Sequence, residues 1–122
     1  MKLLDIDAAV KERFPEAELY EVCRIVNDLE HKLACEICSP CGISVRTAPL
    51  NFNTDAQKAL LLNEEHILLY VYYVFWMLSL NEMNLEVANA YSALFSEKYN
   101  RLAIFYRRSY TPIKNTPLTG RI

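Results

Sequence analysis

Four cysteines are the side chains in this sequence best suited to chemistry. Three are spaced as Cys35-x-x-Cys38-x-x-Cys41, and Cys23 lies twelve residues before this cluster. Thiolates at such spacing, completed by Cys23 or a histidine, could hold zinc in a tetrahedral site. A disulfide within the cluster and free thiols are the two alternatives. The pattern by itself leaves all three open.

Helix geometry argues against a shared site for all four cysteines. If one helix runs from Cys23 to Cys35, a rise of 1.5 Å per residue separates them by about 18 Å. The cluster is also single, whereas a zinc ribbon presents two pairs of ligands. Free thiols in a reducing compartment are therefore favoured. A metal- or redox-sensing module built on the cluster remains the third hypothesis for the function.

Neither histidine belongs to a pattern typical of a catalytic site. His31 and His66 are isolated from any recognisable serine or carboxylate arrangement, and the chain has no glycine-rich phosphate loop and no GxSxG motif. His66 is expected in the first turn of a helix, where the positive end of the helix dipole disfavours a charged imidazole. We expect a protein that is not an enzyme and that has no cofactor.

The helices that position these residues follow from composition and periodicity. The chain has 122 residues, enough for one domain, and only two glycines, which favours helices over a sheet. A short helix is expected over 8–14. A second helix begins with Pro15 in its first turn and ends at 39–42. Its apolar stripe has spacings of three and four and consists of Leu19, Val22, Val26, Leu29, Leu33 and Ile37.

Residues 41–62 interrupt the helical pattern. Ile43 and Val45 alternate with polar neighbours, which predicts a short strand or extended segment. Pro49 and the polar run 51–55 indicate a loop. We therefore expect an irregular insert with a short extended or β segment between the second helix and the next one.

The segment 64–108 predicts two long helices joined by a polar turn at 81–84. The first is apolar on all sides, so we expect it to be buried at the centre of the domain. Its expected core residues are Tyr70, Tyr72, Tyr73 and Trp76. The second has one apolar face and ends near Tyr110, because Pro112 disfavours helix at the preceding residue.

The predicted fold is mainly α, a bundle of about four helices over residues 1–110 with the insert at about 41–62. Residues 111–122 contain two prolines and three spaced apolar side chains. They are expected to form an extended arm that docks into a partner, with a frayed chain end as the alternative.

Charge and hydropathy restrict the possible partners. The net charge of −2 disfavours a protein that coats nucleic acid. The basic and aromatic cluster at 101–110 could touch phosphates, but the cationic end of a helix is the more common explanation. The apolar run 67–80 is about 14 residues long, below the roughly 20 that span a bilayer. The first residues do not resemble a signal peptide, so a soluble protein is expected.

The order and spacing of several segments resemble a known family. The early helix contains Ile25-Val26-Asn27-Asp28-Leu29-Glu30-His31-Lys32-Leu33, and Leu60–Leu62 leads into the tyrosine-rich Leu69-Tyr70-Val71-Tyr72-Tyr73. After the break Leu80-Asn81-Glu82 come Asn89, Tyr91, Ser92-Ala93-Leu94-Phe95, Tyr99 and Tyr106-Arg107-Arg108, followed by a proline. Over residues 16–112 the chain resembles the small helical head–tail connector (head-completion) proteins of long-tailed bacteriophages. It departs from them in having Glu64-Glu65-His66 before the tyrosine-rich helix, and in its cysteine cluster.

This resemblance implies a structural virion protein made in the cytoplasm of a bacterial host. Copies of the chain would form a ring, twelve-fold like the portal, between the portal protein and the next neck or tail component. Genome DNA would pass nearby without specific binding. Contacts between copies or within the core are expected from the fourth helix and the arm. The expected interface residues are Leu94, Phe95, Tyr99, Tyr106, Arg107, Arg108, Tyr110, Ile113, Leu118 and Ile122. The alternative is a small helical adaptor or regulatory module that binds a partner helix.

Overall fold

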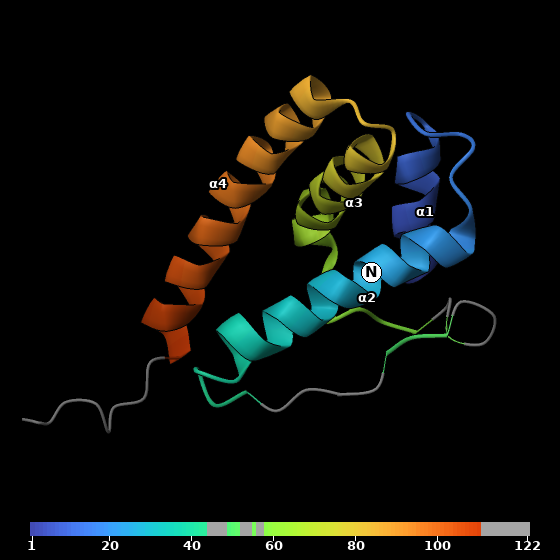
Figure 1. Cartoon of the computed structure of the whole chain (residues 1–122). Helices are drawn as coiled ribbons and strands as arrows, with labels where there is room; N and C mark the ends of the chain where they lie inside the picture. Colours follow the sequence, from blue (N-terminus) through green and yellow to red (C-terminus); the bar gives the residue numbers. More distant parts are fainter. Residues whose placement is uncertain (44–48, 52–54, 56–57, 111–122) are drawn as a thin grey trace, which may run out of the picture.

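Helix α3 lies at the centre of the structure and contacts each of the other α-helices (Figure 1). The structure is a computed structural model that describes all residues except 44–48, 52–54, 56–57 and 111–122. The described elements are α1 (Leu3–Lys11), α2 (Leu19–Leu33), the π-helix η1 (Ala34–Cys38), the 3₁₀ turn η2 (Glu64–His66), α3 (Ile67–Asn81) and α4 (Leu85–Tyr110). The prediction of a mainly helical chain with four α-helices is therefore confirmed.

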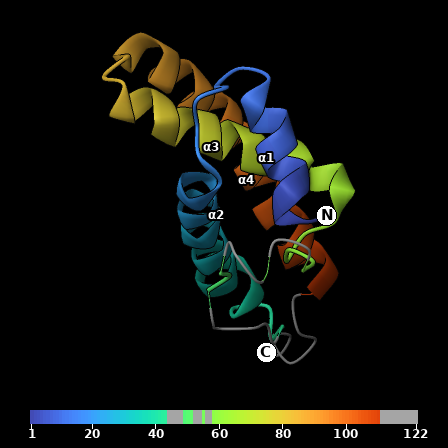
Figure 2. The same ribbon diagram turned by 90° about the vertical axis from the view of Figure 1, so that its right-hand side faces the viewer.

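Helix α1 begins earlier than the sequence indicated. Leu3, Ile6 and Val10 are fully buried at spacings of three and four, so the apolar face already starts at Leu3. The carboxylate of Asp5 accepts a hydrogen bond from the backbone N–H of Lys2 at 2.9 Å, which satisfies one donor at the helix start. Figure 2 shows α1 lying against α3 on the side away from α4.

Helix α2 carries the predicted apolar stripe, but it starts at Leu19 rather than at Pro15. Pro15 lies in a turn, and the backbone N–H of Ala17 donates to Phe14 at 3.1 Å before the helix begins. At its other end α2 widens into η1, where Ser39 N–H donates to the carbonyl of Ala34 at 2.9 Å. The continuation η1 then packs against α4.

Helices α3 and α4 form an antiparallel hairpin, as the short polar turn predicted. Met83 has a φ of 60°, which reverses the chain. Asn84 then donates its backbone N–H to Ser79 at 2.9 Å, and its side-chain oxygen accepts from Val87 N–H at 3.3 Å. This second contact caps the start of α4.

The expectation that α3 is buried on all sides holds only in part. Tyr70 is fully buried, whereas Tyr72, Tyr73 and Trp76 are only partly buried. Leu68, near the start of the helix, is 45% exposed. Three neighbouring helices do not enclose a fourth completely, so part of the apolar surface of α3 faces solvent.

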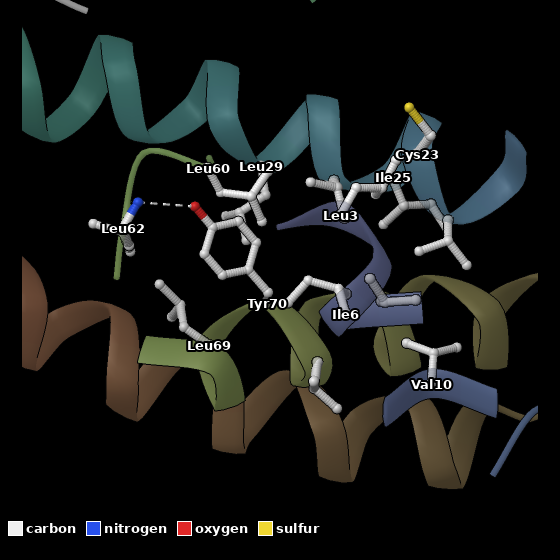
Figure 3. Packing of buried hydrophobic residues seen from close by; sticks show 14 of the residues in the cluster. Leu3, Ile6, Val10, Cys23, Ile25, Leu29, Leu60, Leu62, Leu69 and Tyr70 are labelled. Atoms are coloured by element: carbon white, nitrogen blue, oxygen red, sulfur yellow. Dashed lines mark hydrogen bonds between the residues drawn. The ribbon is translucent and has the colours of Figure 1, made fainter. Parts of the chain in front are cut away.

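A buried hydrogen-bond network connects α2, α3 and the end of the insert. Glu30 is 6% exposed, and its Oε2 accepts from the Tyr70 hydroxyl at 2.5 Å and from Leu61 N–H at 3.0 Å. The Tyr70 oxygen accepts from Leu62 N–H at 3.4 Å (Figure 3). Apolar side chains from α1, α2, α3 and the insert surround the ring of Tyr70.

The predicted β segment of the insert is not seen in the described residues, and this prediction is corrected. Ile43 is outside any strand, and 44–46 lie outside the described residues. Backbone N–H and C=O groups of the insert instead form hydrogen bonds with side chains of α2. Asn27 donates to Leu50 C=O and accepts from Leu50 N–H, each at 2.9 Å. An isolated antiparallel bridge between Lys2 and Ala59 is the only β contact among the described residues.

We predict that Tyr70→Phe lowers the free energy of unfolding by about 1–3 kcal/mol. The substitution removes a donor from the buried Glu30 and an acceptor from Leu62 N–H, and unsatisfied buried groups carry this cost. Urea unfolding at neutral pH measures the change. Tyr72→Phe, which removes the hydroxyl of a partly buried tyrosine on the same helix, is the matched control and should change stability by less than about 0.5 kcal/mol. Equal losses of unfolding free energy in the two variants would contradict a stabilising role for the hydrogen-bond network.

Candidate interaction surfaces

The face of α4 that packs on α3 is built from residues seven apart. Ala88, Phe95 and Leu102 are each less than 5% exposed and lie on one line along the helix. The ring centroid of Phe95 lies 5.1 Å from Tyr73 and 5.8 Å from Trp76, both on α3. Of the predicted interface residues, Phe95 is therefore a core residue, and its side chain offers no surface to a partner in this fold.

Tyr99 contacts the chain's own π-helix. Its hydroxyl donates to Glu36 Oε1 at 2.5 Å, and Lys32 Nζ lies 3.1 Å from Glu36 Oε2 and 5.2 Å from the centre of the Tyr99 ring. Tyr106 is partly buried, and its carbonyl accepts from the Cys41 thiol at 3.6 Å. These contacts bind the C-terminal half of α4 to η1 and to the turn that follows.

The Tyr99–Glu36 hydrogen bond shifts the acidity of both groups. The pKa of Tyr99 is raised, first by burial and then by the bond to the Glu36 carboxylate. The pKa of Glu36 is lowered by the bonds from Tyr99 and Lys32, although this carboxylate is half exposed. The contact is thus favoured while Glu36 is ionised and Tyr99 is neutral.

Three of the remaining predicted interface residues of α4 are exposed. Leu94 is 43% exposed, and Arg107 and Arg108 face solvent. Tyr110 is the last residue of α4. Ile113, Leu118 and Ile122, like the whole predicted arm, lie outside the described residues.

A groove lies between the start of α3 and the C-terminal half of α4. Its volume is about 380 Å³. Leu68, Leu69, Leu102 and Phe105 form its apolar lining, and Glu65, His66, Lys98 and Arg101 form its polar lining. Phe105 is 56% exposed and contributes the largest apolar side chain. We call these eight residues the basic groove, because Lys98 and Arg101 are followed along α4 by Arg107 and Arg108.

A second exposed apolar surface lies at the turn between α3 and α4. Met83 is 84% exposed, Leu85 62% and Leu80 40%, and Glu82 and Glu86 are exposed beside them. We call these five residues the acidic tip. The sequence pattern predicted a polar turn here and did not indicate an exposed apolar surface. The sequence does contain a sign of this surface, because leucine and methionine occur in a turn that requires no apolar side chain.

A more polar cavity of about 430 Å³ lies below the acidic tip, lined by the α1–α2 connection and the adjoining ends of α3 and α4. The hydroxyl of Ser79 is buried there without a hydrogen-bond partner. Arg13 lies on the same lining, with its guanidinium 5.5 Å from the centre of the Tyr91 ring. A serine nucleophile needs a base within hydrogen-bonding distance. Ser79 has none among the residues that the structure describes, so these residues give no sign of an activated serine in this cavity.

The cysteines occupy four different environments, and all four are free thiols. Cys23 is buried, and its thiol donates to Leu50 C=O at 3.5 Å. Cys35 is exposed, with its sulfur 3.7 Å from His31 Nε2. Cys38 is buried, and Cys41 is directed to α4. Burial raises the pKa of both Cys23 and Cys38.

This arrangement gives the metal hypothesis no geometric basis in the described part of the chain. No group of three or more His, Cys, Asp or Glu side chains there could hold a metal ion. The helical path spreads the cluster around η1 and the following turn. The spacing of three residues therefore does not bring its thiols to one point.

Comparison with known proteins finds no matching family, no matching characterised protein and no matching solved structure. Across the residues that the structure describes, no helix combines the length and the apolar character needed to cross a membrane.

We predict that Tyr99→Phe lowers the free energy of unfolding at neutral pH by about 0.5–1.5 kcal/mol, the usual contribution of one hydrogen bond. The pKa of Glu36 is lower in the folded protein than its ordinary value of 4.5. The stabilisation is therefore fully present above pH 4.5 and is lost as the pH falls through the lowered pKa of the folded state. The difference between wild type and variant should therefore shrink in acid. Urea unfolding between pH 7 and pH 3 tests this, and a constant difference would contradict it.

We also predict an order of thiol reactivity. Cys35 should react first with a disulfide reagent such as DTNB at pH 8, because its thiol is exposed to the reagent. Cys23 and Cys38 should react at least about tenfold more slowly, since each is buried and has a raised pKa. Mass spectrometry of the labelled peptides identifies each site. Labelling of Cys38 before Cys35 would contradict the described placement.

Proposed function

We propose that this chain is a non-enzymatic structural subunit of a bacteriophage head–tail connector, located in the neck of the virion. The observation that carries the proposal is the presence of two separate exposed apolar surfaces on one helical hairpin. A subunit of a ring needs two different faces, one for each neighbour, because head-to-tail contacts pair unlike surfaces. The basic groove and the acidic tip meet this requirement.

The sequence resemblance supports the same function. Most of the segments on which it rests lie in α2, α3 and α4, and the connection between α3 and α4 falls at the expected break. In this proposal the ring lies between the portal protein and the next neck component, with DNA passing through without specific binding. Twelve copies would match the portal. Residues 111–122 would reach a neighbouring copy or the portal as an extended arm.

The basic groove also supports a second candidate, a helical adaptor. An apolar floor with Lys98 and Arg101 on its rim fits an amphipathic helix that carries acidic residues. Such an adaptor would bind one partner in a fixed ratio and would form no ring on a portal. The two functions therefore differ in the assembly they produce.

Electron microscopy of the chain mixed with the portal protein of the same phage tests the connector proposal. We expect a ring of density beneath the portal with the full-length chain. The ring should be lost in a chain that ends at Tyr110 and in a full-length chain with serine in place of Ile113, Leu118 and Ile122. Circular dichroism serves as the control for folding of both variants.

The possible outcomes separate the parts of this proposal. A ring that persists in both variants would support the connector and overturn the role of the arm. Folded full-length protein that leaves the portal bare would overturn the connector and favour the adaptor.

A further inference from the structure

The basic groove and the acidic tip are complementary in polarity. The tip presents exposed Met83 and Leu85 between the carboxylates of Glu82 and Glu86. The groove presents Leu68 and Phe105 beside Lys98 and Arg101. An apolar projection with acidic neighbours thus has a counterpart in an apolar hollow with a basic rim.

The charges near the two surfaces are segregated along the chain. From 67 to 97 there is no lysine or arginine, and from 98 to 122 there is no aspartate or glutamate. The groove does contain Glu65 on its α3 side, where it lies 3.4 Å from His66. On its α4 side, Arg101 is 77% exposed and reaches Glu97 only at 4.0 Å, so its guanidinium is open to a partner.

The helix dipole accounts for part of this pattern but not for all of it. Acidic side chains near the start of α4 and basic ones near its end each stabilise the helix. The dipole gives no reason for leaving Met83, Leu85 and Phe105 in solvent. Exposed apolar groups at both ends need a separate explanation, and contact with a partner supplies one.

The two surfaces cannot meet within one molecule. Leu85 of the tip and Phe105 of the groove lie 20 residues apart in α4, which corresponds to roughly 30 Å along the helix. The tip of a chain can therefore fill only the groove of another molecule. A second copy of this chain carries exposed apolar side chains and acidic neighbours on its own tip.

We propose that the acidic tip of one copy inserts into the basic groove of the next copy. Met83 and Leu85 cover Leu68 and Phe105, and Glu82 and Glu86 approach Lys98 and Arg101. Because the contact joins unlike surfaces, a pair of copies keeps one free groove, on the first copy, and one free tip, on the second, for further copies. Repetition closes into a ring or continues as a filament. The tip–groove contact is inferred from the two surfaces alone. Only the identification of the resulting ring as a head–tail connector rests on the proposed function.

A charge-exchange experiment with the full chain tests the contact. One variant carries Glu82→Lys and Glu86→Lys, and a second carries Lys98→Glu and Arg101→Glu. Sedimentation velocity at low ionic strength, up to millimolar protein, measures self-association, because exposed charges act over longer distances there. Each variant alone should associate at least about tenfold more weakly than wild type, as for loss of paired charges at an interface.

Mixing gives the decisive result. In an equimolar mixture, each reversed tip faces a reversed groove and each native tip faces a native groove, so association should recover. A chain with all four substitutions should also assemble by itself. A wild-type chain that stays monomeric, variants that assemble like wild type, or a mixture that does not recover would each overturn the proposal.

An apolar pair provides the matched control. Phe105→Ser removes the largest side chain of the groove and should weaken association at least about tenfold, as expected for an aromatic anchor. Ile104→Ser changes a neighbour that is 46% exposed but does not line the groove, and it should leave association unchanged. Equal effects would overturn the assignment of the groove.

Self-association and portal binding are separate measurements. Charge-dependent assembly without density on the portal would retain the tip–groove contact and reject the connector. A ring on the portal that ignores the charge exchange would retain the connector and reject the contact.

Discussion

A carboxylate in the hydrophobic core is the constraint on which the rest of this structure depends. Glu30 comes from a helix whose neighbouring buried residues are apolar, and a buried carboxylate without hydrogen bonds would be strongly unfavourable. Tyr70 and the backbone of Leu61 supply the donors. The position of α3 against α2 and the point where the insert returns to the core are therefore set by one group.

The path of the chain after Glu30, through the end of α2 and the π-helix η1, determines which surfaces of α4 stay exposed. The π-helix carries Glu36 and the following turn to α4, where Tyr99 and the backbone of Tyr106 bind them. On its α3 side α4 is packed through Phe95 and Leu102. With these two faces occupied, Leu94 and Phe105 remain in solvent, and the groove beside Phe105 is a consequence of this packing.

The spacing of the cysteines suggested a shared metal site that the structure does not form among its described residues. Residues three apart lie on the same side of a regular α-helix, but Cys35 and Cys38 belong to the wider π-helix and Cys41 to the turn after it. The structure directs one thiol to solvent, one to the core and one to α4. Their separate environments follow from the helix and the turn after it, and no local rule on cysteine spacing contains that information.

The sequence by itself determined the helical class, the apolar stripe of α2, the central position of α3 and the hairpin between α3 and α4. Each of these depends on periodicity and chain breaks, which are local properties. It did not determine that Phe95 is core while Phe105 is exposed, since both lie on apolar positions of one helix. It also could not show that the insert uses Asn27 instead of a β partner. Only the tertiary structure decided these points, because burial and hydrogen-bond pairing depend on which elements meet across the molecule.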